Sequence, residues 1–128
     1  MAGVRLLALK LVPAAALVLV AAALGACSHT AELGSGRVLR VVMTDYHMNP
    51  GRIRVQAGEL TIVVRNLGRL THNFVLLRGD QAQVQTTPIA PGSRAQLTVI
   101  LTPGTYVVDS SLFSDRAVGL YGTLIVTG

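Results

Sequence analysis

Alternating apolar and polar residues dominate the chain from residue 37 onward, a pattern typical of half-buried β-strands. The alternation runs through residues 39–44, 60–65 and 96–101, and shorter apolar runs lie at 74–77 and 123–126. Turn-forming residues separate these segments at Asn49-Pro50-Gly51, Ala57-Gly58-Glu59, Arg78-Gly79-Asp80, Pro91-Gly92-Ser93 and Pro103-Gly104. No stretch of this region has helical periodicity. About seven short strands at this spacing predict an all-β fold, a single Greek-key β-sandwich or barrel.

The first 26 residues have the features of an export signal. Arg5 and Lys10 form a basic start, and the apolar run 11–24 that follows is too short to span about 30 Å of hydrocarbon comfortably. Leu24-Gly25-Ala26-Cys27 is similar to a bacterial lipobox, whose cysteine is lipidated and becomes the mature N-terminus. We therefore predict that Cys27, the only cysteine, carries a lipid anchor. An uncleaved membrane anchor and a plain signal peptide with a chance cysteine are the alternatives.

This interpretation gives residues 1–26 as a lipoprotein signal peptide, 27–36 as the lipidated cysteine with a flexible polar tether, and 37–128 as one folded domain. Without the signal, 102 residues remain, with nine arginines, no lysine and six acids, a net charge of +3. We expect the protein on the outer face of the cytoplasmic membrane or in the periplasm. A single cysteine permits no internal disulfide, so stability must come from a packed core. Patches of basic and aromatic residues typical of nucleic-acid binding are absent.

Two segments carry the information on function, residues 71–74 (Thr-His-Asn-Phe) and residues 104–122, which open with Gly-Thr-Tyr. They resemble the segments of a cupredoxin that deliver the first His ligand and form the copper-binding loop. That loop has the pattern G-T-Y-x-x-x-C-x-x-x-x-H-x-x-x-G-M-x-G in the family. The resemblance places Ser110, Asp115 and Leu120 at the positions of Cys, His and Met.

The resemblance implies a cupredoxin-like domain with a degenerate type 1 copper site. Such a site needs two imidazoles, a thiolate and a weak axial thioether, and only His72 remains of these ligands. Ser110 is a hard alcohol that stays protonated at neutral pH, and it cannot replace the thiolate. Leu120 cannot coordinate a metal. We therefore expect no metal, no cofactor and no enzymatic activity.

A metal-binding or electron-transfer protein with an atypical site is the alternative. His72 and Asp115, with His47 as a further candidate, would then hold copper. The two interpretations differ on whether His72 and Asp115 converge in space with a third donor. A hydrolase built on Ser110 is disfavoured, because the sequence has no G-x-S-x-G elbow and no evident oxyanion loop.

The resemblance also implies structural roles for residues outside the ligand positions. Asn73 is next to the first ligand position. It should join its own loop to the copper-binding loop by hydrogen bonds to Ser111, and these two loops are called the ligand loops below. Tyr46 and Met48 occupy two positions that are usually aromatic in the family and point into the core.

Leu112 and Phe113 place two large apolar side chains in the ligand loop. In cupredoxins the face around this loop is the apolar docking surface for partners, so these residues are candidates for contact with a protein. Alternatively, they fold inward and fill the volume vacated by the metal. We expect a membrane-anchored, extracytoplasmic binding or assembly module, whose partners are membrane lipid through Cys27 and an envelope protein.

Overall fold

The structure is a computed structural model, and it describes residues 3, 30–33, 36–112 and 114–128. Its strands are β1 Ala31–Glu32, β2 Val38–Met43, β3 Met48–Asn49, β4 Arg52–Gln56, β5 Gly58–Asn66, β6 Val75–Arg78, β7 Gln81–Gln85, β8 Arg94–Leu101, β9 Gly104–Asp109 and β10 Tyr121–Thr127. No helix occurs in the described ranges. The predicted all-β fold is confirmed, although the described chain forms more strands than the pattern indicated.

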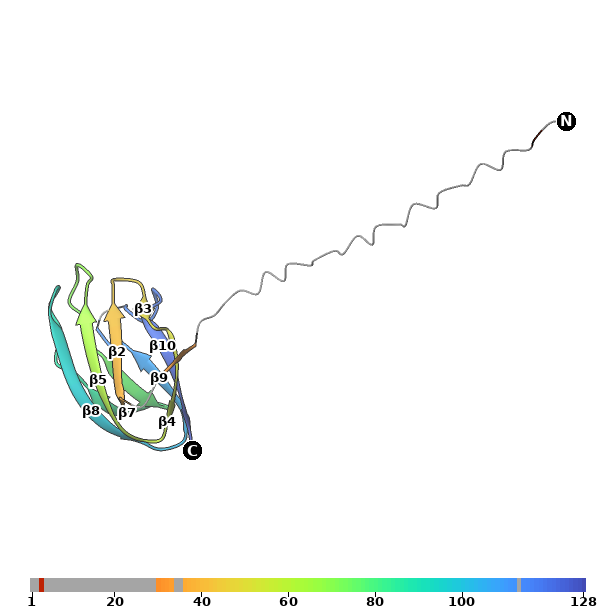
Figure 1. The fold of residues 1–128 in the computed structure, drawn as a ribbon. Coiled ribbons are helices and arrows are strands. Elements are labelled where there is room, and N and C mark those ends of the chain that lie inside the picture. The colour runs from red at the N-terminus through yellow and green to blue at the C-terminus, as the bar shows by residue number, and fades with distance from the viewer. Residues whose placement is uncertain (1–2, 4–29, 34–35, 113) are drawn as a thin grey trace.

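The strands form two sheets that face each other (Figure 1). Sheet A has the order β1-β4-β10-β9-β6-β7, and sheet B has the order β3-β2-β5-β8. β2 runs parallel to β5, and β4 runs parallel to both β1 and β10. The other described pairs are antiparallel. Strands that pair in a sheet are often distant in sequence, as in a Greek-key sandwich.

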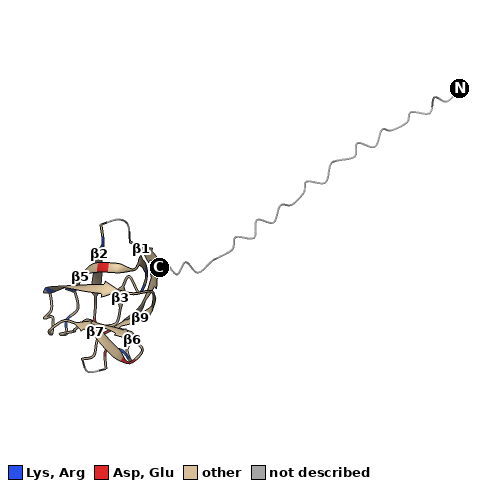
Figure 2. Cartoon of the chain, turned by 90° about the horizontal axis from the view of Figure 1, so that it is seen from below, with Lys and Arg blue, Asp and Glu red and all other residues tan. Residues whose placement is uncertain are grey.

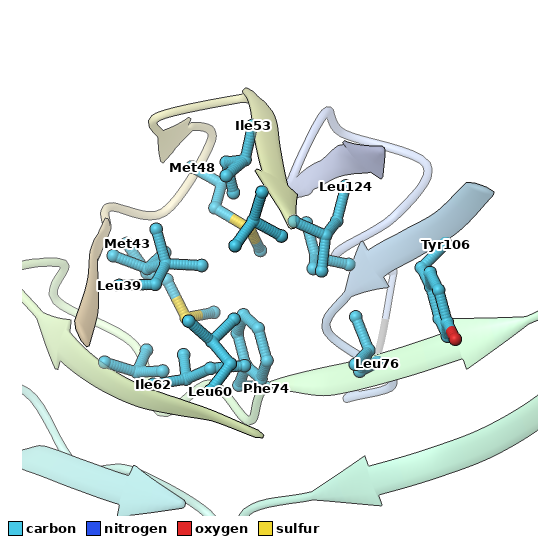
Figure 3. Close-up of a cluster of buried hydrophobic side chains, with 14 of the residues drawn as sticks. Leu39, Met43, Met48, Ile53, Leu60, Ile62, Phe74, Leu76, Tyr106 and Leu124 are labelled. Carbon is cyan, nitrogen blue, oxygen red and sulfur yellow. The ribbon is translucent and has the colours of Figure 1, made fainter. Parts of the chain in front are cut away.

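The hydrophobic core fills the space between the two sheets (Figure 3). Sheet B provides one wall through alternate buried residues, which are Leu39, Val41 and Met43 of β2 and Leu60, Ile62 and Val64 of β5. Ile53 of β4 and Leu124 of β10 pack against them from sheet A. Full burial of such a side chain contributes about 1.5–3 kcal/mol. A core of this size can stabilise the domain without a disulfide.

Two sequence predictions about the early part of the chain are wrong. Ala31–Glu32, expected within a flexible tether, forms β1 and pairs with Ile53 and Arg54 of β4. Tyr46, expected in the core, is 61% exposed because it lies in the loop after β2. Met48 is buried, as predicted.

Apart from residue 3, the predicted signal peptide lies outside the described residues, as does the expected lipidation site Cys27. Among the residues that the structure describes, no helix has the length and apolar character needed to cross a membrane.

Three loops meet at one end of the sandwich, opposite the C-terminus (Figure 1). β2 and β5 run in parallel toward this end, and β9 reaches it where its last residue, Asp109, pairs with Tyr121 at the start of β10. The loops that follow β2, β5 and β9 therefore lie close together, and they hold the candidate site.

Candidate functional site

His72 is the centre of a buried polar cluster at this end of the sandwich. Its backbone exchanges two hydrogen bonds with Ile89, of 3.2 Å and 2.6 Å, and its side chain is fully buried. His72 Nδ1 lies 2.7 Å from Asp115 Oδ2, and His72 Nε2 lies 3.1 Å from Asp45 Oδ1. Because an ionised carboxylate only accepts hydrogen bonds, both contacts are satisfied when both ring nitrogens carry hydrogen.

Asp45 links the loop after β2 to the loop after β5. Its Oδ1 accepts hydrogen bonds from the backbone N–H groups of Leu70 (3.0 Å) and Arg69 (2.9 Å). These two N–H groups, and then His72, lower the pKa of Asp45 below its ordinary value of 3.8, because they stabilise the charged form. Gly68 lies directly against this carboxylate, and a Cβ at that position would collide with it. The close approach of Asp45 therefore requires glycine at position 68.

Ser110 and Asp115 close the cluster on the other side of the imidazole. Ser110 Oγ donates to Asp115 Oδ2 at 2.5 Å, the same oxygen that faces His72 Nδ1. Ser110 Oγ also accepts a hydrogen bond of 3.2 Å from the backbone N–H of Asn73. Both Ser110 and Asp115 are buried. A continuous chain of hydrogen bonds thus connects Asn73, Ser110, Asp115, His72 and Asp45.

Asn73 joins the two ligand loops through a second set of contacts. Its Nδ2 donates to Ser111 Oγ at 2.9 Å, and its Oδ1 accepts from the Ser111 backbone N–H at 2.8 Å. Two hydrogen bonds between the same pair of residues fix the distance and the orientation of both loops. This is the loop-to-loop contact that the resemblance implied.

Leu120, which the resemblance assigns to the position of the axial thioether, is part of the apolar core. Its side chain has no exposed surface, and its backbone N–H donates to the Asp115 carbonyl at 2.9 Å. Leu120 therefore holds the ligand loop together through its backbone and packs into the core with its side chain.

The donors of this cluster do not fit a type 1 copper site. Ser110 supplies no thiolate, which such a site needs. Its Oγ and His72 Nδ1 lie at hydrogen-bond distances of 2.5 Å and 2.7 Å from Asp115 Oδ2, whereas ligands about 2.0–2.1 Å from one tetrahedral ion stand more than about 3 Å apart. Asp45 faces the opposite ring nitrogen, so a single ion at Nδ1 cannot reach it. The described ranges contain no group of three His, Cys, Asp or Glu residues arranged to hold a metal.

The cluster is also unsuited to nucleophilic catalysis by Ser110. A serine nucleophile needs a base that accepts its proton, and in the usual arrangement the histidine lies between serine and aspartate. Here Asp115 lies between Ser110 and His72, and Ser110 is only 2% exposed. A substrate in solvent therefore has no access to the hydroxyl.

A second buried carboxylate, Asp109, lies beside the cluster. Its Oδ2 is 3.3 Å from Arg116 Nη1, and its Oδ1 has no hydrogen-bond partner among the described residues. Burial raises the pKa of Asp109, and the positive charge of Arg116 opposes that shift. The ion pair adds a further tie between β9 and the ligand loop.

The structure brings together some of the predicted site residues and leaves others apart. His72 and Asp115 converge, but their third partner is Asp45 and not His47. The His47 side chain is exposed and makes no hydrogen bond or ion pair with the described residues. Sequence reasoning missed Asp45, although an aspartate directly after the strand at 39–44 was a signal that could have found it.

The apolar part of the ligand loop is only partly represented in the structure. Leu112 is half-buried and lines an apolar hollow with Leu70, Thr71 and Pro88, next to Asp115. Leu70 is 59% exposed. Phe113, the other residue predicted to contact a partner protein, lies outside the described residues. Leu112 therefore neither points freely into solvent nor is fully enclosed.

Comparison with known proteins agrees with the resemblance found in the sequence. The family model described as a cupredoxin-like domain matches residues 15–126. Reduced auracyanin from Roseiflexus castenholzii has a TM-score of 0.69 and 18% identity, over 74% of this chain and 100% of that chain. Auracyanin A, a blue copper protein from Chloroflexus aurantiacus, has a TM-score of 0.64 and 13% identity, over 76% of this chain and 100% of that chain. At such identities these structures show a shared fold alone.

The chain is also similar to curated proteins of iron uptake. The iron uptake system component EfeO of Escherichia coli strain K12 is 29% identical over 113 residues, and the EfeO of Shigella flexneri is equally similar. The match covers 88% of this chain but only 29% of either relative. This chain thus corresponds to less than a third of the length of these relatives.

Proposed function

Because the chain belongs to the cupredoxin-like domain family, we propose that it is a non-catalytic, membrane-anchored binding module of the cell envelope. We further propose that it works within an iron-uptake assembly, with an envelope protein as its partner. The similarity to EfeO, an iron uptake system component, supports the assembly. Lipid on Cys27 would keep the module at the membrane, since each buried CH₂ contributes about 0.8 kcal/mol to anchoring.

The observation that carries this proposal is the hydrogen-bonded chain from Ser110 through Asp115 and His72 to Asp45. The resemblance to cupredoxins assigns Ser110, Asp115 and His72 to copper-ligand positions, and the hydrogen-bonded chain links the three loops at that end of the sandwich. Loops held in this way present a preorganised surface, which lowers the entropy cost of binding a partner. The hollow lined by Leu70 and Leu112 adjoins this cluster and offers apolar surface for that contact.

A metal-binding or electron-transfer protein is the second candidate function. One observation favours it: His72 and two aspartates, Asp115 and Asp45, converge, and nitrogen and carboxylate donors suit several transition-metal ions. The two carboxylates lie on opposite ring nitrogens, however, so the cluster would have to open before one ion could bind both. Such a rearrangement would break the hydrogen bonds that connect the loops.

Iron uptake in the source bacterium tests the first proposal. Deletion of the gene should lower uptake of radiolabelled iron under iron limitation, and the wild-type gene should restore it. Leu70→Ser in the hollow should restore uptake less well, whereas Tyr121→Ser, also at an exposed apolar residue but outside the hollow, should restore it fully. Normal uptake in the deletion strain would refute a role in iron uptake.

Titration of the purified protein with Fe(III) and Cu(II) separates the two candidates. The binding module should take up neither ion tightly. Micromolar or tighter binding that is lost in both Asp45→Asn and Asp115→Asn would instead establish the second candidate.

A further inference from the structure

The outer face of sheet B carries three arginines that lie close together. Arg65 of β5 and Arg94 of β8 are direct cross-strand partners. Arg40 of β2 lies opposite Val63, which is two residues before Arg65 on β5. All three arginines are exposed, Arg40 and Arg65 between buried residues and Arg94 beside the half-buried Ala95, so their side chains point away from the core. Figure 2 shows the basic residues of the described chain in blue.

These arginines have no acidic partner in the described part of the chain. The ion pairs there involve only His72 and Arg116 as the positive groups, and none of the three guanidinium groups makes a hydrogen bond. The acid on the same face, Glu59, lies opposite Ile100 and six residues along β5 from Arg65. Like charges directly opposite each other on a sheet destabilise it. An external anion would offset this repulsion.

Exposed aliphatic side chains occur on the same face. Ile100 of β8 is 76% exposed and Val38 of β2 is 41% exposed. Val38 and Val63 also line a surface hollow together with Arg40 and Arg94. A guanidinium group binds phosphate oxygens through two parallel hydrogen bonds. Aliphatic groups beside it can enter the boundary between headgroups and acyl chains.

The position of the proposed anchor places this face within reach of a membrane. Three residues separate Cys27 from β1 at Ala31, and at up to about 3.6 Å per residue the four steps between them span at most about 14 Å. β1 is at the edge of sheet A, and the chain then enters sheet B at Val38. Packed sheets lie about 10 Å apart, so a tether of this length holds the domain close to the bilayer.

We propose that the outer face of sheet B lies against the membrane and binds anionic lipid headgroups through Arg40, Arg65 and Arg94. The proposal rests on the membrane location in the proposed function. It leaves the loops at the end of the sandwich, with the hollow at Leu112, free to contact a protein partner.

Sedimentation with lipid vesicles tests this proposal without the anchor. A chain beginning at Ser28 keeps the whole core, which lies between Leu33 and Val126. It should bind vesicles of equal parts phosphatidylcholine and phosphatidylglycerol, bind phosphatidylcholine vesicles weakly, and be released by salt. The triple variant R40Q/R65Q/R94Q should bind the anionic vesicles about 100-fold more weakly, since each basic residue contributes about 1 kcal/mol.

The matched control is R52Q/R54Q/R69Q, which removes the same charge. Arg52 and Arg54 lie on β4, beside β1 but in sheet A, and Arg69 lies in the loop after β5. The affinity of this variant for the anionic vesicles should fall only several-fold. Thermal melting should show that both variants are folded. Equal losses in the two variants would mean that net charge alone attracts the protein and would overturn the proposal.

Absence of binding to anionic vesicles would also overturn the proposal. Binding to a polyglutamate peptide but not to vesicles would overturn it as well, and would point to an acidic protein segment as the ligand. None of these outcomes bears on the anchor at Cys27 or on iron uptake.

Discussion

A single imidazole, that of His72, determines the chemistry of the site. The resemblance to cupredoxins assigns this residue to a copper-ligand position, but both of its ring nitrogens face carboxylates. Ser110 and Asp115 are therefore complementary replacements: the hydroxyl donates to the carboxylate, and the carboxylate pairs with the ring. Buried polar groups are costly unless they are satisfied, so these residues depend on one another.

Substitution of His72 by alanine should destabilise the domain by about 1–3 kcal/mol, because it leaves the buried carboxylate of Asp115 without its hydrogen bond to the ring. His47→Ala is the matched control, since His47 is exposed and surface substitutions usually change stability by less than about 0.5 kcal/mol. Urea unfolding of both variants provides the measurement. Similar midpoints for the two variants would show that the buried cluster does not stabilise the fold.

Asp45 should make the domain more sensitive to acid. Its pKa is lowered in the folded state by the N–H groups of Leu70 and Arg69, so the unfolded state binds the proton more readily. The stabilisation is complete above the ordinary value of 3.8 and is lost as the pH falls through the lower folded pKa. Melting temperatures measured from pH 7 to pH 2 should fall less steeply below pH 3.8 in Asp45→Asn than in the wild type. The exposed Asp80, changed to asparagine, serves as the control, and a wild-type slope in Asp45→Asn would contradict the assignment.

Addition of Cu(II) tests the assignment of Ser110, Asp115 and Leu120 to the copper-ligand positions. Addition of Cu(II) to the wild-type domain should give no intense visible band, because that band requires a cysteine thiolate. Ser110→Cys alone should still fail to give a normal type 1 site, since Asp115 and Leu120 supply neither the second imidazole nor the thioether. Ser110→Cys/Asp115→His/Leu120→Met should come closer to one. An intense blue colour in the unmodified domain would show that the ligand positions are wrongly assigned.

At the scale of elements, the site depends on loops that a few hydrogen bonds hold together. Asp45 in the loop after β2 accepts hydrogen bonds from backbone N–H groups of the loop after β5. Asn73 and Ser111 join the latter loop to the ligand loop. The regular strands position these loops, but the hydrogen bonds between loops determine which side chains meet.

Gly68→Ala tests this dependence, because the added Cβ would collide with the Asp45 carboxylate. The loop must move, and overpacking of this kind typically costs about 1–3 kcal/mol. Gly36→Ala is the control, since a Cβ there meets no atom within 4 Å. Chemical denaturation would measure both variants, and a Gly68→Ala protein as stable as Gly36→Ala would argue against close packing of Asp45.

At the scale of the whole molecule, the sandwich offers two separate surfaces. The end with the three loops carries the buried cluster and the hollow at Leu70 and Leu112. The outer face of sheet B carries Arg40, Arg65 and Arg94. A lipid anchor before β1 would allow both surfaces to be used at once, one toward the bilayer and the other toward a partner.

Processing at Cys27 tests the anchor on which this arrangement depends. The mature protein should lack residues 1–26, carry lipid and partition into detergent. Cys27→Ala should remain as an uncleaved precursor or lose lipid labelling, as measured by mass spectrometry and detergent phase separation. A variant with the mass and partitioning of the wild type would rule out a lipidated cysteine.

The sequence by itself determined the fold class, and its resemblance to cupredoxins assigned the ligand positions, because both depend on local order. Alternation with period two along β2, β5 and β8 assigns residues to the core or to solvent before any pairing is known. The spacing of Ser110, Asp115 and Leu120 is a property of one loop, so it could be compared with the cupredoxin pattern directly.

Only the tertiary structure decided which residues complete the cluster. Asp45 is 27 residues from His72 in the sequence, and no local pattern states that the loops after two parallel strands converge. For the same reason the sequence wrongly placed Tyr46 in the core, and it left β1 unrecognised, since two residues form a strand only when β4 is available to pair with them. Contacts between distant segments depend on how the sheets pack and on the ends of their strands, and these are properties of the folded chain.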